Sequence, residues 1–340
     1  MKYLIQTIII FLISTTRGIA QDINFSQFYE LPLLRNPALA GIFAGDFRIT
    51  AAYRSQWQSV TTPYETEALG AELKFSLGEH NYDFLTIGLQ ITNDKAGDSR
   101  LSKTQVLPVI NLHKSVNGEK DSYISAGFMA GPVQNRFDPT KLQFDDQFIN
   151  GSFSPTNPTR QTFSNTNFTY WDMAAGLSYT SQWPNDIRYY VGMALFHFTK
   201  PRVAFISTND IKLNPKLAIN VGASIPTSDV DKFVLYGDIF AQGGHKQAQG
   251  GFLYYHDLVN YSDDDIISMG AGAFYRWDDA IIPVIRLDYY QVGVGLSYDV
   301  NVSKLRTASQ MRGGLEVTLS YKTYFNILNS SLNKLRCPTF

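Results

Sequence analysis

Few residues in this sequence have the types and spacing that catalysis or metal binding requires. The only cysteine is Cys337, so neither a cysteine-containing metal site nor an internal disulfide is expected. No GxSxG elbow, phosphate-binding loop or GxGxxG motif is present. The sequence therefore predicts a protein that is not an enzyme and has no metal and no cofactor. The five histidines show no metal-ligand spacing: His80, His113, His197, His245 and His256.

One acidic run resembles part of a calcium site. It consists of Asp263, Asp264 and Asp265. A calcium loop needs ligands spaced along about twelve residues, and none follow this run. A solvated turn is therefore the preferred interpretation.

Eight charged residues lie at alternate positions of otherwise apolar or small-residue segments. Because successive side chains of a strand point to opposite faces, all eight are expected on the face opposite the apolar one. There they could line a polar conduit or form a docking site for a plug. The preferred interpretation is a network of ion pairs that fills the inside of a barrel. The eight are Arg48, Arg54, Glu72, Lys74, Asp172, Arg286, Asp299 and Glu316.

The segments that carry these charges alternate in hydrophobicity, as residues 291–300 illustrate. Similar alternation occurs near residues 167–180, 214–225 and 311–322. The polar face is rich in Gly, Ala, Ser and Thr, which suit a crowded interior better than a water-facing surface. In residues 291–300, the apolar face has Val292, Val294, Leu296, Tyr298 and Val300, and the other face has Gln291, Gly293, Gly295, Ser297 and Asp299.

This pattern predicts an all-β protein, a transmembrane antiparallel β-barrel of about 14 strands. Aromatic residues make up 14% of the chain, and they often end the apolar faces, as an interfacial girdle would. A soluble β-sandwich adhesin is the less favoured alternative. The formal net charge of −1 gives no electrostatic basis for binding nucleic acid. The expected strands are 46–56, 65–77, 83–93, 101–114, 121–132, 167–180, 187–199, 214–225, 232–242, 247–257, 265–276, 279–288, 290–300 and 311–322.

The expected connections are mostly short after even-numbered strands and mostly longer after odd-numbered ones. The longest is 133–166. Outer-membrane barrels have short periplasmic turns and long external loops. We therefore expect a protein of the cell outer membrane, contacting outer-membrane lipid, with both termini in the periplasm.

The chain is expected to divide into four parts. Residues 1–20 read as a secretory signal peptide, with Lys2, an apolar stretch and small residues before the cleavage site. Residues 21–45 form an N-terminal segment that enters or plugs the lumen from the periplasmic side. Residues 46–322 form the barrel, and residues 323–340 form a periplasmic tail. The expected plug motif comprises Phe25, Phe28, Tyr29, Arg35, Asn36, Pro37 and Gly41.

Several stretches, in order from the N-terminal segment to the last residue, resemble the PorP/SprF family of outer-membrane proteins. This family belongs to the type IX secretion system and the gliding machinery. The one departure is Ser55, where an asparagine is expected. The matching stretches are 25–29 (FSQFY), 36–41 (NPALAG), 53–57 (YRSQW), 275–277 (YRW), 279–283 (DAIIP), 297–305 (SYDVNVSKL), 314–321 (GLEVTLSY) and 336–340 (RCPTF).

The resemblance implies an integral outer-membrane barrel without enzymatic activity. It would help to export, or anchor on the surface, a large secreted adhesin or other cargo with a C-terminal sorting domain. Its further partners would be other type IX secretion subunits. The alternative is a FadL-like transport barrel for an apolar solute, because an Asn-Pro-Ala motif also occurs in the hatch of such transporters.

Overall fold

A computed structural model describes residues 22–57, 62–78, 82–116, 121–163, 165–205, 210–260, 266–303, 312–325, 330–331 and 340. The expected signal peptide, His80, the acidic run 263–265, Cys337 and most of the expected tail 323–340 lie outside the described residues.

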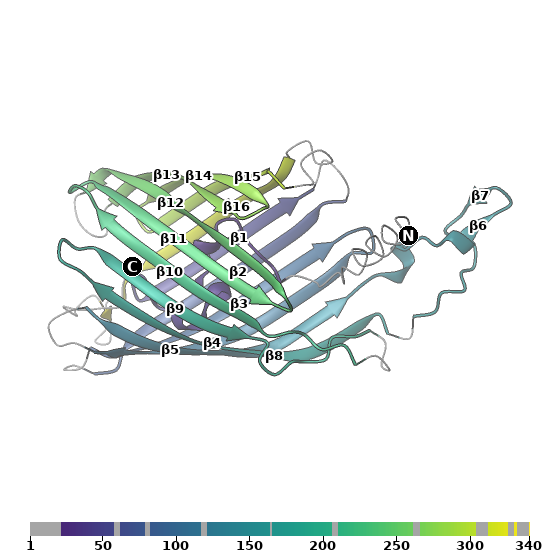
Figure 1. Ribbon diagram of the computed structural model, residues 1–340, viewed down its shortest axis with the longest axis horizontal. Helices are drawn as coiled ribbons and strands as arrows, with labels where there is room; N and C mark the ends of the chain where they lie inside the picture. The colour runs from purple at the N-terminus through teal and green to yellow at the C-terminus, as the bar shows by residue number, and fades with distance from the viewer. Residues whose placement is uncertain are drawn as a thin grey trace, which may run out of the picture.

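Fourteen strands form one closed antiparallel barrel, in which the first strand pairs with both the second and the last (Figure 1). The predicted fold class is confirmed, and a β-sandwich is excluded because the sheet closes on itself. The strands are β1 (Phe47–Gln56), β2 (Tyr64–Ser76), β3 (Phe84–Ala96), β4 (Leu101–Ser115), β5 (Tyr123–Arg136), β8 (Asn167–Gln182), β9 (Arg188–Phe196), β10 (Lys216–Pro226), β11 (Asp231–Gln242), β12 (His245–Asn260), β13 (Ile266–Arg276), β14 (Ala280–Tyr289), β15 (Val292–Asn301) and β16 (Arg312–Thr323).

The side chains of each strand alternate between an apolar outer face and a lumen face. In β15, Val294 and Leu296 are exposed on the outside, whereas Ser297 and Asp299 are buried inside. An exposed apolar belt of this kind is stable only where lipid covers it. The lumen-facing side chains are therefore covered by other residues of the protein, inside the barrel.

The three longest connections all leave the same end of the barrel, which we call the long-loop end. They join β5 to β8, β9 to β10 and β15 to β16. The first contains the 3-10 helices η3 (Pro139–Lys141) and η4 (Asp145–Gln147) and a hairpin, β6 (Phe148–Ile149) with β7 (Ser152–Phe153), that projects from the barrel (Figure 1).

The expected contrast between short and long connections is only partly correct. Three connections at the long-loop end are tight, namely 97–100, 243–244 and 277–279. We call the opposite end the short-turn end. The contrast between the two ends therefore rests on three long loops.

Residues 22–46, which we call the lumen segment, run through the inside of the barrel (purple in Figure 1). The segment contains η1 (Phe28–Glu30), α2 (Pro32–Arg35) and η2 (Pro37–Leu39). It begins at the long-loop end, where Asp22 pairs with Lys103 and Lys216 at the starts of β4 and β10. It ends at the short-turn end, where the Asp46 amide donates to Thr323 of β16. Asp22 and Thr323 thus lie at opposite ends of the barrel, which differs from the expectation that both termini lie on the periplasmic side.

Among the described residues, no helix combines the length and apolar character needed to cross a membrane.

The outer face of β15 provides a test of the membrane assignment. Leu296→Arg should destabilise the barrel by about 2–4 kcal/mol, because an arginine on the lipid face near the bilayer midplane is costly. The control is Tyr321→Arg on the same face but near the end of β16, which should cost roughly 0–1 kcal/mol. Unfolding by guanidinium from lipid vesicles measures both. Equal costs for the two variants would contradict a lipid-facing β15.

Candidate functional site

The lumen segment has little regular structure, so its backbone N–H and C=O groups need partners from the barrel wall. Several of its polar residues, including Ser26, Gln27 and Asn36, have no exposed surface. A buried polar group without a partner costs about 1–3 kcal/mol. The wall supplies the partners at a series of fixed points along the lumen.

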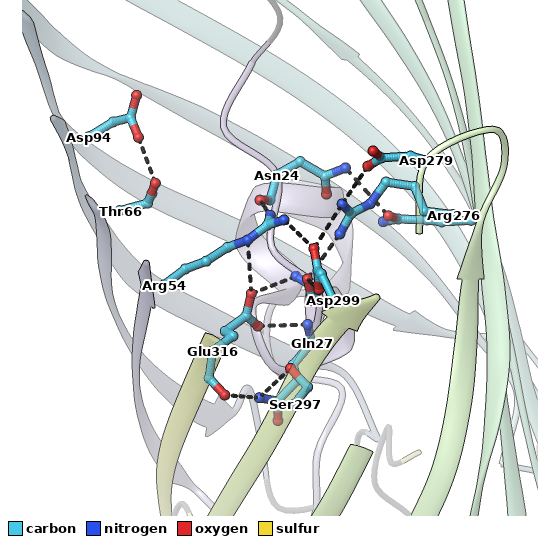
Figure 2. A network of polar contacts seen from close by, with 12 residues as sticks. Asn24, Gln27, Arg54, Thr66, Asp94, Arg276, Asp279, Ser297, Asp299 and Glu316 are labelled. Carbon is cyan, nitrogen blue, oxygen red and sulfur yellow. Dashed lines mark hydrogen bonds and ion pairs between the residues drawn. The ribbon is translucent and has the colours of Figure 1, made fainter. Parts of the chain in front are cut away.

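The first point is Glu316 of β16 (Figure 2). Its carboxylate accepts hydrogen bonds from the backbone amides of Ser26, at 2.6 Å, and Gln27, at 2.7 Å. The Gln27 side chain donates to Ser297 and to the Glu316 carbonyl, and it accepts from Thr318 at 2.8 Å. The carboxylate therefore fixes the backbone, and the three other groups fix the glutamine.

Two arginines and Asp299 surround the same turn (Figure 2). Arg54 of β1 lies 2.6 Å from the Asp299 carboxylate and donates to the Asn24 carbonyl. Arg276 of β13 lies 3.2 Å from Asp299 and donates to the Ser26 hydroxyl at 2.9 Å. Strands β1, β13, β15 and β16 thus contact the lumen segment beside the seam where the barrel closes.

Arg35 makes an ion pair whose two side chains are almost completely buried. Its guanidinium binds both carboxylate oxygens of Asp238 in β11, the shortest contact being 2.6 Å. It also donates to the Tyr190 hydroxyl at 2.7 Å. The side chains of Arg35 and Asp238 are 4% and 0% exposed, so neither charge is solvated.

Asn36 and Pro37 begin the short helix η2. The Asn36 carboxamide oxygen accepts from the Ala38 amide at 2.8 Å, which is an N-cap. The wall has glycine where this turn approaches it. A Cβ on Gly176 would lie 1.9 Å from the Asn36 side-chain oxygen, and one on Gly127 would lie 2.4 Å from the Pro37 backbone. The turn fits only because these wall positions lack side chains.

The next residues are held by polar side chains of the wall. Asn111 donates to the carbonyls of Ala38, at 3.0 Å, and Ala40, at 2.8 Å. Glu72 accepts from the Gly41 amide at 2.8 Å and pairs with Arg48 at 2.6 Å.

Phe43 sits between two wall cations. The Lys74 ammonium donates to the Phe43 carbonyl at 2.7 Å. The guanidinium of Arg48 lies 4.4 Å from the centre of the Phe43 ring, and the Lys74 ammonium lies 4.9 Å from it. Desolvated contacts of this type contribute about 2 kcal/mol.

Apolar contacts fill the space between the polar points. Phe28 and Tyr29 pack against Phe274 and Tyr236, with the Tyr29 ring stacked 4.8 Å from Tyr236 and 5.0 Å from Phe274. The C-terminal residue joins the same cluster: the Phe340 ring lies 4.6 Å from Tyr190 and 5.5 Å from Tyr236. Aromatic residues from both ends of the chain therefore occupy one lumen.

At the long-loop end, the carboxylate of Asp22 pairs with three cationic side chains of the wall. Its carboxylate lies 2.7 Å from His197, 2.9 Å from Lys216 and 3.3 Å from Lys103. Burial raises the pKa of Asp22, but the two lysines and His197 outweigh burial and hold it well below its usual range. His197 also contacts Asp172 at 2.7 Å, and the two carboxylates raise its pKa despite burial.

The structure brings the eight predicted lumen charges together around the lumen segment. Six of them contact it through hydrogen bonds or an ion pair; Arg286, for example, pairs with Glu30 at 2.6 Å. Arg48 contacts the Phe43 ring, and Asp172 reaches the segment through His197. The seven residues of the expected plug motif all lie buried in the lumen.

Several important residues were missed by the sequence analysis. Asp238 and Arg276 lie on the lumen faces of β11 and β13, so extending the alternation rule to those strands would have found them. Lys103 and Lys216 also lie on lumen faces, those of β4 and β10, so the same extension would have found them. Asp22 gave no such signal, because it lies outside the strands. Among the described residues, no three or more His, Cys, Asp or Glu side chains form a group that could hold a metal ion.

Comparisons with known proteins place this site in a family context. A family model described as "Type IX secretion system membrane protein PorP/SprF" matches residues 18–321. No curated protein matches the chain in sequence.

Among solved structures, the chain is similar to the Ralstonia pickettii toluene transporter TbuX, with 11% identity, TM-score 0.48, and 90% of this chain and 95% of that one covered. It is similar to the CymD monoaromatic hydrocarbon channel, with 12% identity, TM-score 0.47, and coverages of 89% and 93%. It is also similar to the translocator domain of the autotransporter NalP from Neisseria meningitidis, with 11% identity, TM-score 0.41, and coverages of 82% and 88%. These likenesses are too low to indicate what this chain binds.

The Arg35–Asp238 pair provides a test of how firmly the segment is held. Arg35→Met should lower the free energy of unfolding by about 3–5 kcal/mol, because it leaves the Asp238 carboxylate buried without its partner. Replacing both residues, Arg35→Met with Asp238→Leu, should recover most of the loss. Guanidinium unfolding from lipid vesicles measures each variant.

The matched control is the solvent-exposed pair of Lys95 and Glu67, whose charged atoms lie 3.8 Å apart. Lys95→Met should change stability by at most about 1 kcal/mol. An Arg35→Met variant no less stable than Lys95→Met would show that the segment does not depend on the buried pair.

Proposed function

This chain belongs to the type IX secretion system membrane protein PorP/SprF family, and from that premise we propose that it helps export or anchor a secreted adhesin-type partner with a C-terminal sorting domain. In this proposal the barrel is a docking platform at the cell surface. The secreted partner binds at the long-loop end, and other secretion subunits bind at the short-turn end, which faces the periplasm. The same platform would serve gliding motility if its partner is a motility adhesin.

The observation that carries the proposal is the filled lumen. The lumen segment runs the length of the barrel and is fixed by ion pairs of Arg35 with Asp238, Glu30 with Arg286, and Asp22 with Lys216. A barrel whose inside is occupied by its own chain is suited to hold a partner on its rim.

The rim offers a surface for such a partner. In the projecting hairpin, Phe148 is 59% exposed and pairs with Phe153, which is 39% exposed, and Ile149 is 43% exposed. A two-stranded hairpin is only marginally stable alone, and its unpaired edges can accept a further strand. Exposed aromatic residues beside free strand edges suit β-augmentation by a β-rich partner.

Transport of an apolar solute is the alternative. It requires the lumen segment to move aside as a hatch, which would separate buried charges from their partners. Each broken pair costs several kcal/mol, and the segment makes several. The geometry therefore favours a fixed segment over a moving one.

Gene deletion with complementation tests the proposal. Deletion should remove one adhesin from the cell surface and leave fatty-acid uptake unchanged, and the wild-type gene should restore the adhesin. A Phe148→Ser, Phe153→Ser variant should reach the outer membrane at normal levels but restore well under half of the surface adhesin. Immunoblots of the medium and surface labelling measure both.

The control variant replaces two exposed apolar residues at the same end of the barrel but outside the hairpin, Leu101→Ser with Ile211→Ser, and should restore the adhesin fully. Loss of fatty-acid uptake with normal secretion would refute the secretion role and favour transport. Equal rescue by the hairpin variant and the control would exclude the hairpin as the docking surface.

A further inference from the structure

A pocket opens between the lumen segment and the wall formed by β10, β11 and β12. It lies at the long-loop end, because it is bordered by Lys216, the first residue of β10, Gln242, the last of β11, and His245, the first of β12. About 100 Å³ of it is free space. The contacts that hold the lumen segment in place do not fill this space.

The inner surface of the pocket is mainly apolar. For comparison, an engineered apolar cavity of about 150 Å³ stays dry and binds benzene. The free space here is smaller than that cavity, so it suits a molecule of one ring at most and not a long acyl chain. The apolar lining consists of Ile23, Phe25, Phe28, Leu31 and Leu34 from the lumen segment and Phe240 from β11.

One polar side chain in the lining lacks a partner for its donor. Gln249 of β12 is 5% exposed, and its Oε1 accepts from the Asn24 side chain at 3.4 Å. Its Nε2 donates to no residue in the described part of the chain. An unpaired buried amide donor costs about 1–3 kcal/mol, which a ligand with an acceptor atom would recover.

The two cations inside the pocket, Arg35 and Lys216, are already paired, and Lys246 at the rim is exposed to solvent. Arg35 is bound by Asp238. Lys216 pairs with Asp22 at 2.9 Å, and its ammonium lies over the rings of Phe196 and Phe240, at 4.7 Å and 5.4 Å. An anionic ligand would therefore gain little inside the pocket, whereas a neutral carbonyl oxygen matches the unpaired buried donor of Gln249.

We propose that this pocket binds a neutral, single-ring-sized apolar molecule through a carbonyl oxygen that accepts a hydrogen bond from Gln249 Nε2. The molecule enters from the long-loop end, where His245 and Lys246 are exposed at the rim. Because it touches both the lumen segment and the wall, it stabilises the seated segment by mass action. Such a site is independent of partner docking on the hairpin.

The test uses the full-length protein in lipid nanodiscs and two probes that differ mainly in the carbonyl group. They are 4-fluoroacetophenone and 1-ethyl-4-fluorobenzene, and fluorine NMR measures the saturable binding of each. In the wild type the ketone should bind about tenfold tighter than its ethyl counterpart, the worth of one net hydrogen bond. The Gln249→Leu variant should abolish that preference.

A second variant fills the space. Leu34 is half-buried and lines the pocket, so Leu34→Trp should abolish saturable binding of both probes. The matched control is Leu85→Trp, at a half-buried position on the lipid-facing side of β3, which should bind like the wild type. Heat-modifiable gel migration establishes that each variant is folded.

Three outcomes would overturn the proposal. They are the absence of saturable binding in the wild type, equal affinity for the two probes, and unchanged binding in folded Leu34→Trp. The last would mean that the probes only partition into the lipid of the nanodisc. The comparison of the two probes in the wild type tests the proposal even if a variant does not fold.

Discussion

The structure depends on one constraint: an irregular chain segment is buried where water cannot satisfy its backbone. Glu316 illustrates the solution, because a single carboxylate accepts two consecutive amides, those of Ser26 and Gln27. A charged acceptor makes such hydrogen bonds about twice as strong as a neutral one. The buried charge of Glu316 is stabilised by the guanidinium of Arg54, which lies 3.8 Å from the carboxylate. Wall charges and segment backbone therefore stabilise each other, and removal of either leaves the other unpaired.

These contacts also connect parts of the barrel that are far apart in sequence. Arg54 belongs to the first strand, Asp299 and Glu316 belong to the last two, and Ser26, in the lumen segment, contacts both carboxylates. The segment thus acts as a bracket across the seam, in addition to the pairing of β1 with β16 from Phe47 and Thr323 to Gln56 and Gly314. Occupation of the lumen and closure of the barrel are coupled by the same residues.

Most of the fold was predictable because a membrane barrel must alternate lipid-facing and lumen-facing residues along every strand. In β15 and β16 that rule identified both Leu296 as outward and Glu316 as inward, and it located the fourteen strands to within a few residues. The course of the lumen segment was not predictable in this way. Its fit depends on missing side chains such as that of Gly176, and on partners such as Asp238, 203 positions from Arg35 in the chain.

The lengths of the loops were also only partly predictable from the sequence. Tight turns such as 243–244 are set by local backbone geometry, with Gly243 and Gly244 both at positive φ, and they contradict a simple rule of long loops on one side. The alternation of residues along a strand does not predict which residues far apart in sequence pair with each other. These pairs form only when the closed barrel brings opposite walls within reach of the lumen segment.

Single-channel conductance across a planar lipid bilayer measures directly whether the lumen segment seals the lumen. The full-length protein should give no stepwise current at moderate voltage. A variant that lacks residues 22–45 should give discrete ohmic steps, because the wall then encloses water. A full-length barrel that conducts as well as the deletion variant would show that the segment leaves the lumen open.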